Sequence, residues 1–460
     1  MRGGTLQHDR PERSEHPMEA SFGGVMAVSE SAPVRQWEGS DAVFGTRVLA
    51  RLLINRNYAL FMGGSFLSAL GSWVQAVAIG WLVYDLTGSP FILGLTNFAQ
   101  MAPLFFFGMF GGVLADRFDR RILLSAGLAT SAVALTVLAI LTIAGRASVP
   151  LIVGISLVLG LANVIVWPAW QPFIKELVPQ TRLREAIAFN AARFNLSRVL
   201  GPAIGGTILA TSGAGTCLAV TAVTSVAVVA VTLAVRRPRA TRATMAPWLS
   251  SLGEGISYVR GDPFTFRLLA VTTLFGLAVM PYATFLPALS QDVLGLGPDG
   301  LGHLLAAAGM GAVVGAIVTG MPQVGTRPRA AMAAFSAISA TGAIAIATWA
   351  PAFSTVPVVA WIALAAIGLG TVGFLTNANT VLQLRVPDHL VGRVMGLWVV
   401  LNAGTNPLGS LALGALAERA PLTWVFGIAG LSAAACAITL MVILNDPSPP
   451  ADVAIGRAPA

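Results

Sequence analysis

Residues 112–121, with the sequence GVLADRFDRR, separate two long apolar runs and decide how the chain folds. Each flanking run is long enough for a helix that crosses a bilayer, which needs about 20 residues. Two helices joined by so short a polar stretch are antiparallel neighbours. Because Lys and Arg are enriched on the cytoplasmic side of membranes, Arg117, Arg120 and Arg121 place this turn at the inner interface.

The composition of the whole chain is typical of a protein whose solvent is mostly lipid. Of 460 residues, 55% are hydrophobic and 10% are charged, and the mean hydropathy is +0.77. Ordinary soluble domains contain about 25% charged residues, so this composition excludes a soluble globular protein. The net charge of +8 is explained by basic residues on the inner face, and no nucleic-acid partner is expected.

Several kinds of chemistry are excluded by what the sequence lacks. Cys217 and Cys436 stand in separate apolar stretches, so they form neither a disulfide framework nor a cysteine metal site. The four histidines form no HExxH-type cluster. We find no GxxxxGK[ST] phosphate loop and no paired nucleophile and base. The sequence therefore predicts neither an enzyme nor a transport ATPase, and it predicts no cofactor and no metal.

Apolar runs bounded by charge, Pro or Gly recur along the chain and predict an all-α membrane protein with twelve transmembrane helices. In the first half the runs are approximately Tyr58 to Tyr84, Phe91 to Ala115, Ile122 to Gly145, Val149 to Phe173, Ala188 to Ser212 and Cys217 to Val235. In the second half they are approximately Phe264 to Leu289, Leu301 to Met321, Ala330 to Ala350, Val356 to Leu382, Val394 to Leu416 and Leu422 to Leu444.

The positions of Lys and Arg predict that both termini lie in the cytoplasm. The predicted outer segments contain only Arg146 and Arg419, whereas the inner segments contain most of the remaining basic residues. The predicted organisation is a disordered cytoplasmic tail (1–46), a six-helix bundle (47–235), a cytoplasmic linker (236–263), a second six-helix bundle (264–445) and a cytoplasmic tail (446–460).

The linker is open to two interpretations. Trp248, Leu249, Leu252, Ile256 and Val259 recur at spacings of three and four residues, which predicts a short amphipathic helix on the inner leaflet. A fluctuating basic loop is the alternative.

An internal repeat relates the two halves of the chain. Landmarks recur at offsets of 205 to 208 residues: Asp85 with Asp292, Val178-Pro179 with Val386-Pro387, and Gly201-Pro202 with Asn406-Pro407. Such a repeat predicts two pseudo-symmetric bundles that face each other across a central cavity.

Residues 112–121 are similar to the G-x-x-x-D-R-x-x-R-R loop of the major facilitator superfamily, and the resemblance covers nearly the whole chain. Residues 81–90 (WLVYDLTGSP) and 194–206 (FNLSRVLGPAIGG) resemble the exporter branch that contains enterobactin exporters and macrolide or multidrug efflux proteins. The resemblance implies that Asp116 helps to lock an inner gate against the eleventh helix, with Arg117 and Arg121 as partners. The predicted conformational switch consists of Gly112, which permits close helix approach, Asp116, Arg117, Arg120 and Arg121.

The chain departs from the family pattern at three points. Asp119 stands where the superfamily often has Gly, and Val324 replaces Asp116 in the second half, so one half alone is expected to carry the switch. The fourth segment lacks the membrane-embedded Arg that many drug and proton antiporters use. Proton coupling through an arginine of the fourth segment is therefore not predicted.

A Gly-Pro stretch in the fifth segment predicts a tightly packed but deformable helix contact. Gly201-Pro202-x-x-Gly205-Gly206 resembles the family's antiporter signature, with Ser197 in place of its first small Gly. Gly201 and Gly205 form a small-xxx-small face, and Pro202 frees a backbone carbonyl. Gly311 and Gly315 repeat the spacing and are the expected facing surface in the second half; helix packing without gating is the alternative.

Arg198 is the charge expected deepest in the membrane. Counting back from Ser212 places it about 9 Å inside the cytoplasmic edge of the hydrocarbon core. A charge there must snorkel, pair or face a wet cavity. Arg198 either bonds a structural carbonyl or serves the cavity, by attracting an anionic substrate group or coupling to a proton. Asp85 and Asp292 are interfacial turn residues or an outer gate, so the coupling candidates are Asp85, Arg198 and Asp292.

Polar and aromatic side chains within the apolar segments are the candidates for a substrate cavity, because a polar group facing lipid is unsatisfied. Interhelical hydrogen bonding is the alternative role of each. The predicted cavity residues are Gln75, Asn97, Gln100, Asn163, Trp167, Gln171, Arg198, Asn377, Trp398 and Asn402.

Taken together, the sequence predicts a multi-pass secondary transporter of the cytoplasmic (inner) membrane that acts by alternating access. The predicted cargo is a hydrophobic or amphiphilic small molecule, such as a drug, a macrolide or a siderophore, exported in exchange for a proton or another ion. An importer or facilitator of a small organic solute with the same fold is the alternative. A monomer in the lipid bilayer is expected.

Overall fold

The computed structural model describes residues 55–235, 248–321, 324, 327–353 and 356–444, and the regular structure within these ranges is helical. The first half contains α2 (Arg56–Thr87), α3 (Pro90–Arg117), α4 (Arg120–Ile143), α5 (Val149–Leu177) and α6 (Leu183–Ala234). The second half contains α7 (Trp248–Gly261), α8 (Pro263–Ala278), α10 (Gly297–Thr319), α12 (Pro328–Phe353), α13 (Pro357–Arg385), α14 (Asp388–Ala417) and α15 (Thr423–Leu444).

Ten helices of the described residues are long and apolar enough to cross a membrane. The prediction of an all-α membrane protein is therefore confirmed. The predicted tails at 1–46 and 446–460 and the first part of the linker, 236–247, lie outside the described residues. Helix α7 occupies the rest of the linker.

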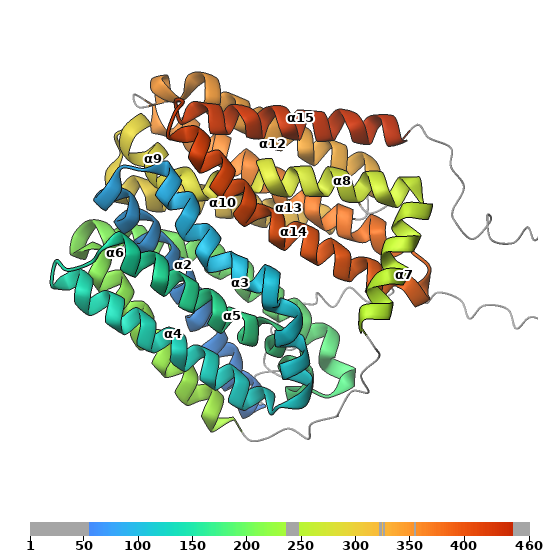
Figure 1. The fold of residues 1–460 in the computed structure, drawn as a ribbon, viewed down its shortest axis with the longest axis horizontal. Coiled ribbons are helices and arrows are strands. Elements are labelled where there is room, and N and C mark those ends of the chain that lie inside the picture. The colour runs from blue at the N-terminus through green and yellow to red at the C-terminus, as the bar shows by residue number, and fades with distance from the viewer. Residues whose placement is uncertain (1–54, 236–247, 322–323, 325–326, 354–355, 445–460) are drawn as a thin grey trace, which may run out of the picture. The chain divides into compact units, whose positions relative to one another are not determined.

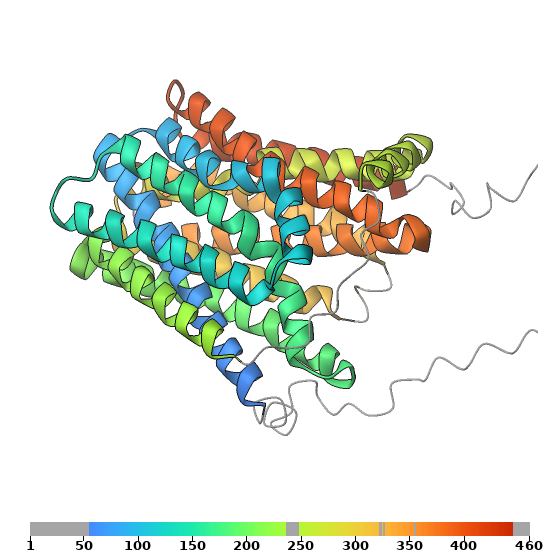
Figure 2. The ribbon, with the colours of Figure 1, turned by 60° about the horizontal axis from the view of Figure 1, so that its bottom comes forward.

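Helix α6 folds back on itself at Gly213. This glycine has φ of 80° and ψ of 171°, a backbone conformation that other residues rarely adopt. The Sγ atom of Cys217 lies 3.5 Å from the carbonyl oxygen of Gly205, twelve residues earlier. A straight helix would separate these two residues by about 18 Å. The break thus divides α6 into two antiparallel limbs, 183–212 and 214–234, and α4 lies beside the second limb (Figure 2).

The span expected from Phe264 to Leu289 is one continuous helical segment, Pro263–Val293, but it is not a regular α-helix throughout. After α8 the chain continues as a 3₁₀ helix (Met280–Phe285), a short α9 (Leu286–Ala288) and a π-helix (Leu289–Val293). Pro281 and Pro287 cause the change, because proline has no backbone N–H for the helical hydrogen-bond ladder. The resulting irregular segment carries Tyr282 and Asp292, which take part in the contacts described below.

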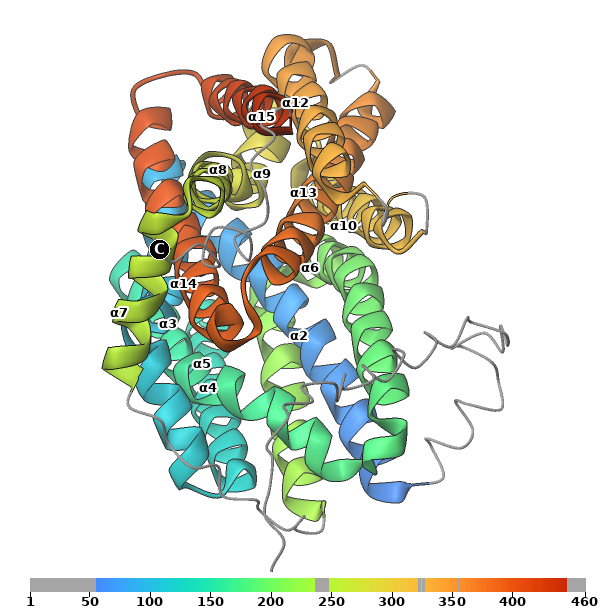
Figure 3. The same ribbon diagram turned by 90° about the vertical axis from the view of Figure 1, so that its right-hand side faces the viewer.

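The two halves meet along two pairs of helices. Figures 1 and 3 show the helices of residues 56–234, coloured blue to yellow-green, on one side of those of residues 263–444, coloured yellow to red. Helix α3 packs against α14, and the first limb of α6 packs against α10. We name the two ends of the bundle by their connections, the α2/α3 end and the opposite α3/α4 end.

The buried core is shared at one end of the bundle and divided at the other. One cluster at the α2/α3 end combines residues of both halves, among them Val83, Leu209, Leu289 and Leu304. At the α3/α4 end, one cluster draws only on residues 58–235 and another only on residues 259–440. Within the described residues, apolar burial therefore holds the halves together at the α2/α3 end.

Candidate substrate pathway between the two halves

Glycines bring the two halves into backbone contact. A Cβ atom built at Gly302 would lie 2.7 Å from Cα of Gly206, and one built at Gly94 would lie 2.3 Å from the carbonyl oxygen of Ser410. Gly94 and Gly302 are separated by the repeat offset, so the two crossings are pseudo-symmetric. No larger residue fits at either position without moving the helices.

Two of the expected glycine contacts occur elsewhere. Gly311 and Gly315 pack against the carbonyl groups of Ala365 and Leu369 in α13, so the expectation that they face the other half is wrong. Spacing alone shows a face on which a neighbour comes close, but it does not identify that neighbour. Gly201 and Gly205 pack against Trp73 and Val74 of α2, in their own half. Pro202 is buried within α6, and its carbonyl oxygen lies against Gly302.

Hydrogen bonds between the halves close the α2/α3 end. The hydroxyl group of Tyr84 donates to the carboxylate of Asp292. The carboxylate of Glu418 accepts from the hydroxyl group of Ser89 at 2.8 Å and from the backbone N–H of Phe91 at 3.3 Å. These bonds connect the ends of α2 and α3 in the first half to the π-helix and α14 in the second.

Asn97 lies at the centre of a polar network just below this closure. Its amide group donates to Oδ1 of Asn406 at 3.2 Å and to Oγ of Ser410 at 2.8 Å. The hydroxyl groups of Ser410 and Thr284 lie 3.2 Å apart. The network joins α3, α14 and the 3₁₀ segment, so Asn97 bonds between helices in this arrangement.

Two polar atoms without hydrogen-bond partners lie on the same face of α14 as Asn406, toward the α3/α4 end. Asn402 and Trp398 precede Asn406 at intervals of four residues, so the three side chains lie on one face. Nε1 of Trp398 and Oδ1 of Asn402 are buried without a hydrogen-bond partner among the described residues. One is a donor and the other an acceptor, and each burial costs about 1–3 kcal/mol unless water or a ligand supplies the missing bond.

Arg198 faces the second half across the interface. Its guanidinium group is close enough to the hydroxyl group of the buried Tyr282 to interact with it electrostatically. The backbone of Arg198 packs against Gly309 of α10. The charge therefore lies between the halves, carried on a backbone that stands at the α6–α10 crossing.

Arg193 is a buried arginine that sequence reasoning missed. It donates to the backbone carbonyl of Ser65 in α2 and, at 2.9 Å, to Oδ1 of Asn190. Its side chain ties the first limb of α6 to α2 within the first half. Its position five residues before Arg198, in the same apolar helix, is the signal that identifies it.

The predicted switch loop forms the turn from α3 to α4. Asp119 is the N-cap of α4 and accepts a hydrogen bond from the backbone N–H of Arg121 at 2.9 Å, which explains an acidic residue at that position. Nε of Arg121 donates to the carbonyl oxygen of Thr232 at 3.1 Å.

The close helix approach expected at Gly112 occurs at Gly111 instead. A Cβ atom built at Gly112 would meet nothing within 4 Å, whereas one built at Gly111 would lie 1.8 Å from the carbonyl oxygen of Val164. Arg117 is exposed, Arg120 begins α4, and the side chain of Asp116 lies outside the described part of the chain.

Two hydrogen-bonded groups of the described residues at the α3/α4 end each lie within one half. Nδ2 of Asn55 donates to the carbonyl oxygen of Leu177 at 2.9 Å. Asp262 accepts from Nη2 of Arg385 at 3.1 Å and caps α8 by accepting from the backbone N–H of Thr265. Burial alone would raise the pKa of Asp262, but the hydrogen bonds from Arg385 and Thr265 outweigh it and hold the pKa below its ordinary value.

The remaining candidates are dispersed. Gln75 is buried in α2, and Asn377 is buried in α13, where its amide group donates to the carbonyl oxygen of Gly373 at 2.8 Å. Trp167 is 63% exposed. Gln100 and Asn163 are half-buried, Asp85 is exposed beside Tyr84, and the side chain of Gln171 lies outside the described part.

Sequence reasoning also missed three polar residues that the interface uses. Tyr84 and Tyr282 meet partners in the opposite half, whereas Thr284 meets Ser410 of its own half, which in turn accepts from Asn97. Their positions in apolar stretches resemble those of core residues. For Tyr282 and Thr284 a signal exists in Pro281 and Pro287, because closely spaced prolines inside a membrane helix mark irregular backbone that packs in the interior.

Comparison with known proteins gives a matching family and relatives that are transporters. The model of a family described as transmembrane secretion effector matches residues 51–454. The chain is 25% identical over 378 residues to the staphyloferrin A transporter of Staphylococcus aureus, covering 81% of this chain and 92% of that protein. It is 26% identical over 358 residues to the enterobactin exporter EntS of Escherichia coli O1:K1, covering 76% and 83%.

Solved structures show the same fold. The nucleoside transporter NupG superposes with a TM-score of 0.67 at 14% identity, covering 84% of this chain and 99% of that one. A bacterial homologue of the iron transporter ferroportin in an inward-facing state also has a TM-score of 0.67 at 14% identity, covering 85% and 99%.

Proposed function

Because the chain belongs to the transmembrane secretion effector family of the major facilitator superfamily, we propose that it exports an amphiphilic, siderophore-like small molecule by proton-coupled alternating access. Membership confirms the family expected from residues 112–121 and makes the chain a multi-pass membrane transporter. The export direction, the coupling and the cargo are the proposed part.

The proposed topology has twelve membrane-crossing segments. The two limbs of α6 count as two spans, and α14, a 30-residue helix outside the ten candidate spans, adds the last. Arg117, Arg120 and Arg121 assign the α3/α4 end to the cytoplasm. Both termini then lie on the cytoplasmic side of the inner membrane.

The division of the core is the observation that carries the mechanism. A shared apolar cluster and hydrogen bonds between the halves close the α2/α3 end, whereas separate clusters serve each half at the α3/α4 end. With the α3/α4 end in the cytoplasm, this arrangement is the inward-open state of a cycle in which the halves rock about a central site. The opposite state would require the bonds of Tyr84, Ser89 and Asn97 to break.

The chemistry of the interface supports an anionic or hydrogen-bonding amphiphile as cargo. Trp398 and Asn402 offer an aromatic surface with an unused donor and acceptor, and Arg198 supplies positive charge across the interface. The two curated relatives carry names of siderophore transport, which agrees with such a cargo.

Asp292 and Arg198 are the proposed coupling groups. Protonation of Asp292 weakens the bond that its carboxylate accepts from Tyr84, so proton binding from outside favours opening of the α2/α3 end. Arg198 couples the site to the same movement, because its backbone lies on the α6–α10 crossing.

Everted vesicles with an acidic interior provide the test. Lipophilic cations, neutral macrolides and anionic catecholates are added in turn, and the pH gradient is followed with a fluorescent dye. We expect anionic catecholates to dissipate the gradient with the intact chain and much less with Asp116→Asn, which should remain in the membrane. No response to the whole panel contradicts proton-coupled export, and accumulation of a solute in right-side-out vesicles supports the importer.

A further inference from the structure

We propose a binding site for an anionic phospholipid in the groove between α2 and the second limb of α6, with the phosphate on Arg56 and one acyl chain between the helices. The groove has a volume of about 590 Å³ and is lined by Arg56, Ala59, Leu60, Gly63, Gly64, Leu67, Ala227 and Val231. Apart from Arg56, every lining residue is apolar or glycine. Its assignment to the inner leaflet rests on the topology of the proposed function.

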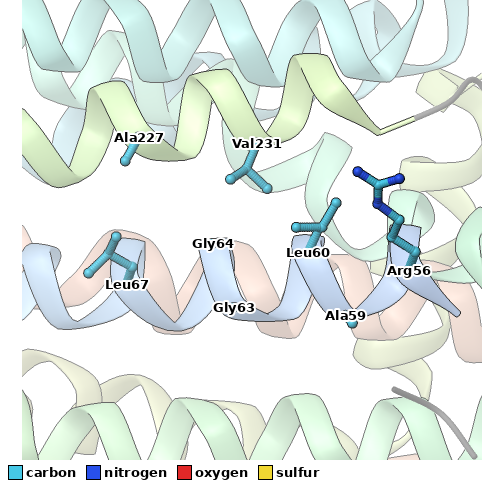
Figure 4. A pocket seen from close by; sticks show the side chains of 8 residues that line it. All are labelled: Arg56, Ala59, Leu60, Gly63, Gly64, Leu67, Ala227 and Val231. Carbon is cyan, nitrogen blue, oxygen red and sulfur yellow. The ribbon is translucent and has the colours of Figure 1, made fainter. Parts of the chain in front are cut away.

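Small residues create the groove. A Cβ atom at Gly63 would meet nothing within 4 Å, whereas one at Gly64 would lie 3.1 Å from Cγ1 of Val231. The helices therefore approach at Gly64 and leave open space beside Gly63. Figure 4 shows Leu60 and Leu67 on either side of the two glycines, with Ala227 and Val231 on the facing helix.

The length of the groove fits one leaflet. From Arg56 to Leu67 the helix rises by about 16 Å, at about 1.5 Å per residue. One leaflet contributes about half of a hydrocarbon core that is about 30 Å thick. Leu60 and Leu67 are each 37% exposed, as expected of side chains that contact lipid. An acyl chain lying along the helix axis therefore runs from the arginine at the interface to the middle of the bilayer.

Charge at the mouth of the groove selects the head group. Arg56 is exposed at the first residue of α2, and in Figure 4 its guanidinium group points across the groove toward the end of α6. Among the described residues no carboxylate forms an ion pair with it. Arg121 is held at the same end through Thr232, the residue after Val231. Two guanidinium groups at an interface favour a head group whose phosphate has no balancing cation, as in phosphatidylglycerol, over a zwitterionic one.

Native mass spectrometry of the purified full chain, after incubation with phosphatidylglycerol or phosphatidylcholine, tests the site without measuring transport. We expect the chain to retain phosphatidylglycerol preferentially. Gly63→Leu fills the open space and should reduce retention about tenfold, because it displaces several methylene groups of the acyl chain. Arg56→Gln should reduce the preference for phosphatidylglycerol about fivefold while retention of phosphatidylcholine stays unchanged.

Gly154→Leu is the matched control, because Gly154 is an exposed helical glycine of α5 whose added Cβ would also meet nothing within 4 Å. It should bind lipid as the parent chain does. Equal retention by Gly63→Leu and the parent overturns the site, and an unchanged head-group preference in Arg56→Gln overturns the role of the arginine. Displacement of the lipid by inorganic phosphate alone would show an anion site without an acyl chain. A failure here leaves the vesicle result intact, since the two readouts are independent.

Discussion

The hydroxyl group of Tyr84 donates to the carboxylate of Asp292, a residue 208 positions further along the chain. That separation equals the offset of the internal repeat, so each residue occupies nearly the position of the other in the opposite half. Residues related by a twofold axis contact each other only close to that axis, as in a symmetric dimer. The bond therefore marks the pseudo-twofold axis at the α2/α3 end.

Tyr84→Phe removes this bond and should open the α2/α3 end. A hydrogen bond to a charged group contributes about 1.5–3 kcal/mol, so the population of the closed state should fall at least about tenfold relative to the open state. Spin labels at Leu86→Cys and Arg419→Cys, both exposed at this end, report the distance between the halves by double electron–electron resonance. Gln291→Asn, which alters the exposed residue beside Asp292, is the control. An unchanged distance distribution in Tyr84→Phe contradicts a gating role.

Gly302→Ala should separate the α6–α10 crossing. The added Cβ would lie 2.7 Å from Cα of Gly206 and 3.0 Å from the carbonyl oxygen of Pro202, so the helices must move apart. We expect the same labels to show a loss of the closed state and transport to fall at least about tenfold, while the chain remains in the membrane. Gly154→Ala, made where an added Cβ has open space, should transport normally. Normal transport by Gly302→Ala would exclude this crossing from the cycle.

Arg198→Ala should impair substrates with a negative group most. Removal of the guanidinium group takes away the positive charge beside Tyr282, so a catecholate should lose about 1.5–3 kcal/mol of binding, the contribution of a hydrogen bond to a charged group. A neutral macrolide should be affected little, and Arg198→Lys should restore part of the difference. Competition for uptake into everted vesicles measures the ratio, and equal effects on both substrates would end the cavity proposal.

Asn402→Leu should stabilise the chain and weaken transport. The substitution removes a buried acceptor that has no partner among the described residues, so the free energy of unfolding should rise by about 1 kcal/mol, which the melting temperature reports. Loss of a substrate contact should raise KM. Asn377→Leu is the matched comparison, because the amide groups of Asn377 and Asn402 each donate to the carbonyl oxygen four residues earlier, whereas only Asn402 has a buried Oδ1 without a partner among the described residues. We expect Asn377→Leu to lack the stabilisation of Asn402→Leu. A destabilised Asn402→Leu chain would show that a water already satisfies Oδ1.

Asp262→Asn should destabilise the second half in a pH-dependent way. It leaves Arg385 buried without its counter-charge, which costs about 3 kcal/mol at neutral pH. Because the pKa of Asp262 is lowered by folding, the carboxylate contributes its full stability above its ordinary pKa of 3.8 and loses it as the pH falls through the lower pKa of the folded chain. The difference from the parent should be constant between pH 5 and 8 and shrink below about pH 4. Asp388→Asn, at an exposed acid, should show no such difference.

The apolar runs predicted the helices well because a membrane-crossing helix has one physical requirement, about 20 residues that tolerate lipid. Gly213 falls between two of the predicted runs, and its positive φ lets the chain reverse there. Partners were harder to predict. The glycines at 311 and 315 mark a close contact, but only packing decides that α13 makes it. Tyr84 and Asp292 stand 208 residues apart, and no local pattern encodes their bond.

The shared cluster at the α2/α3 end has a consequence for how the chain loses its structure. Val83 and Leu209 are buried against Leu289 and Leu304, so melting of either half would expose apolar surface of the other. In this state the two halves are therefore one cooperative unit and melt in a single transition. When the α2/α3 end opens, the two halves no longer bury this shared apolar surface against each other. The cooperativity of unfolding therefore depends on which conformation the chain is in.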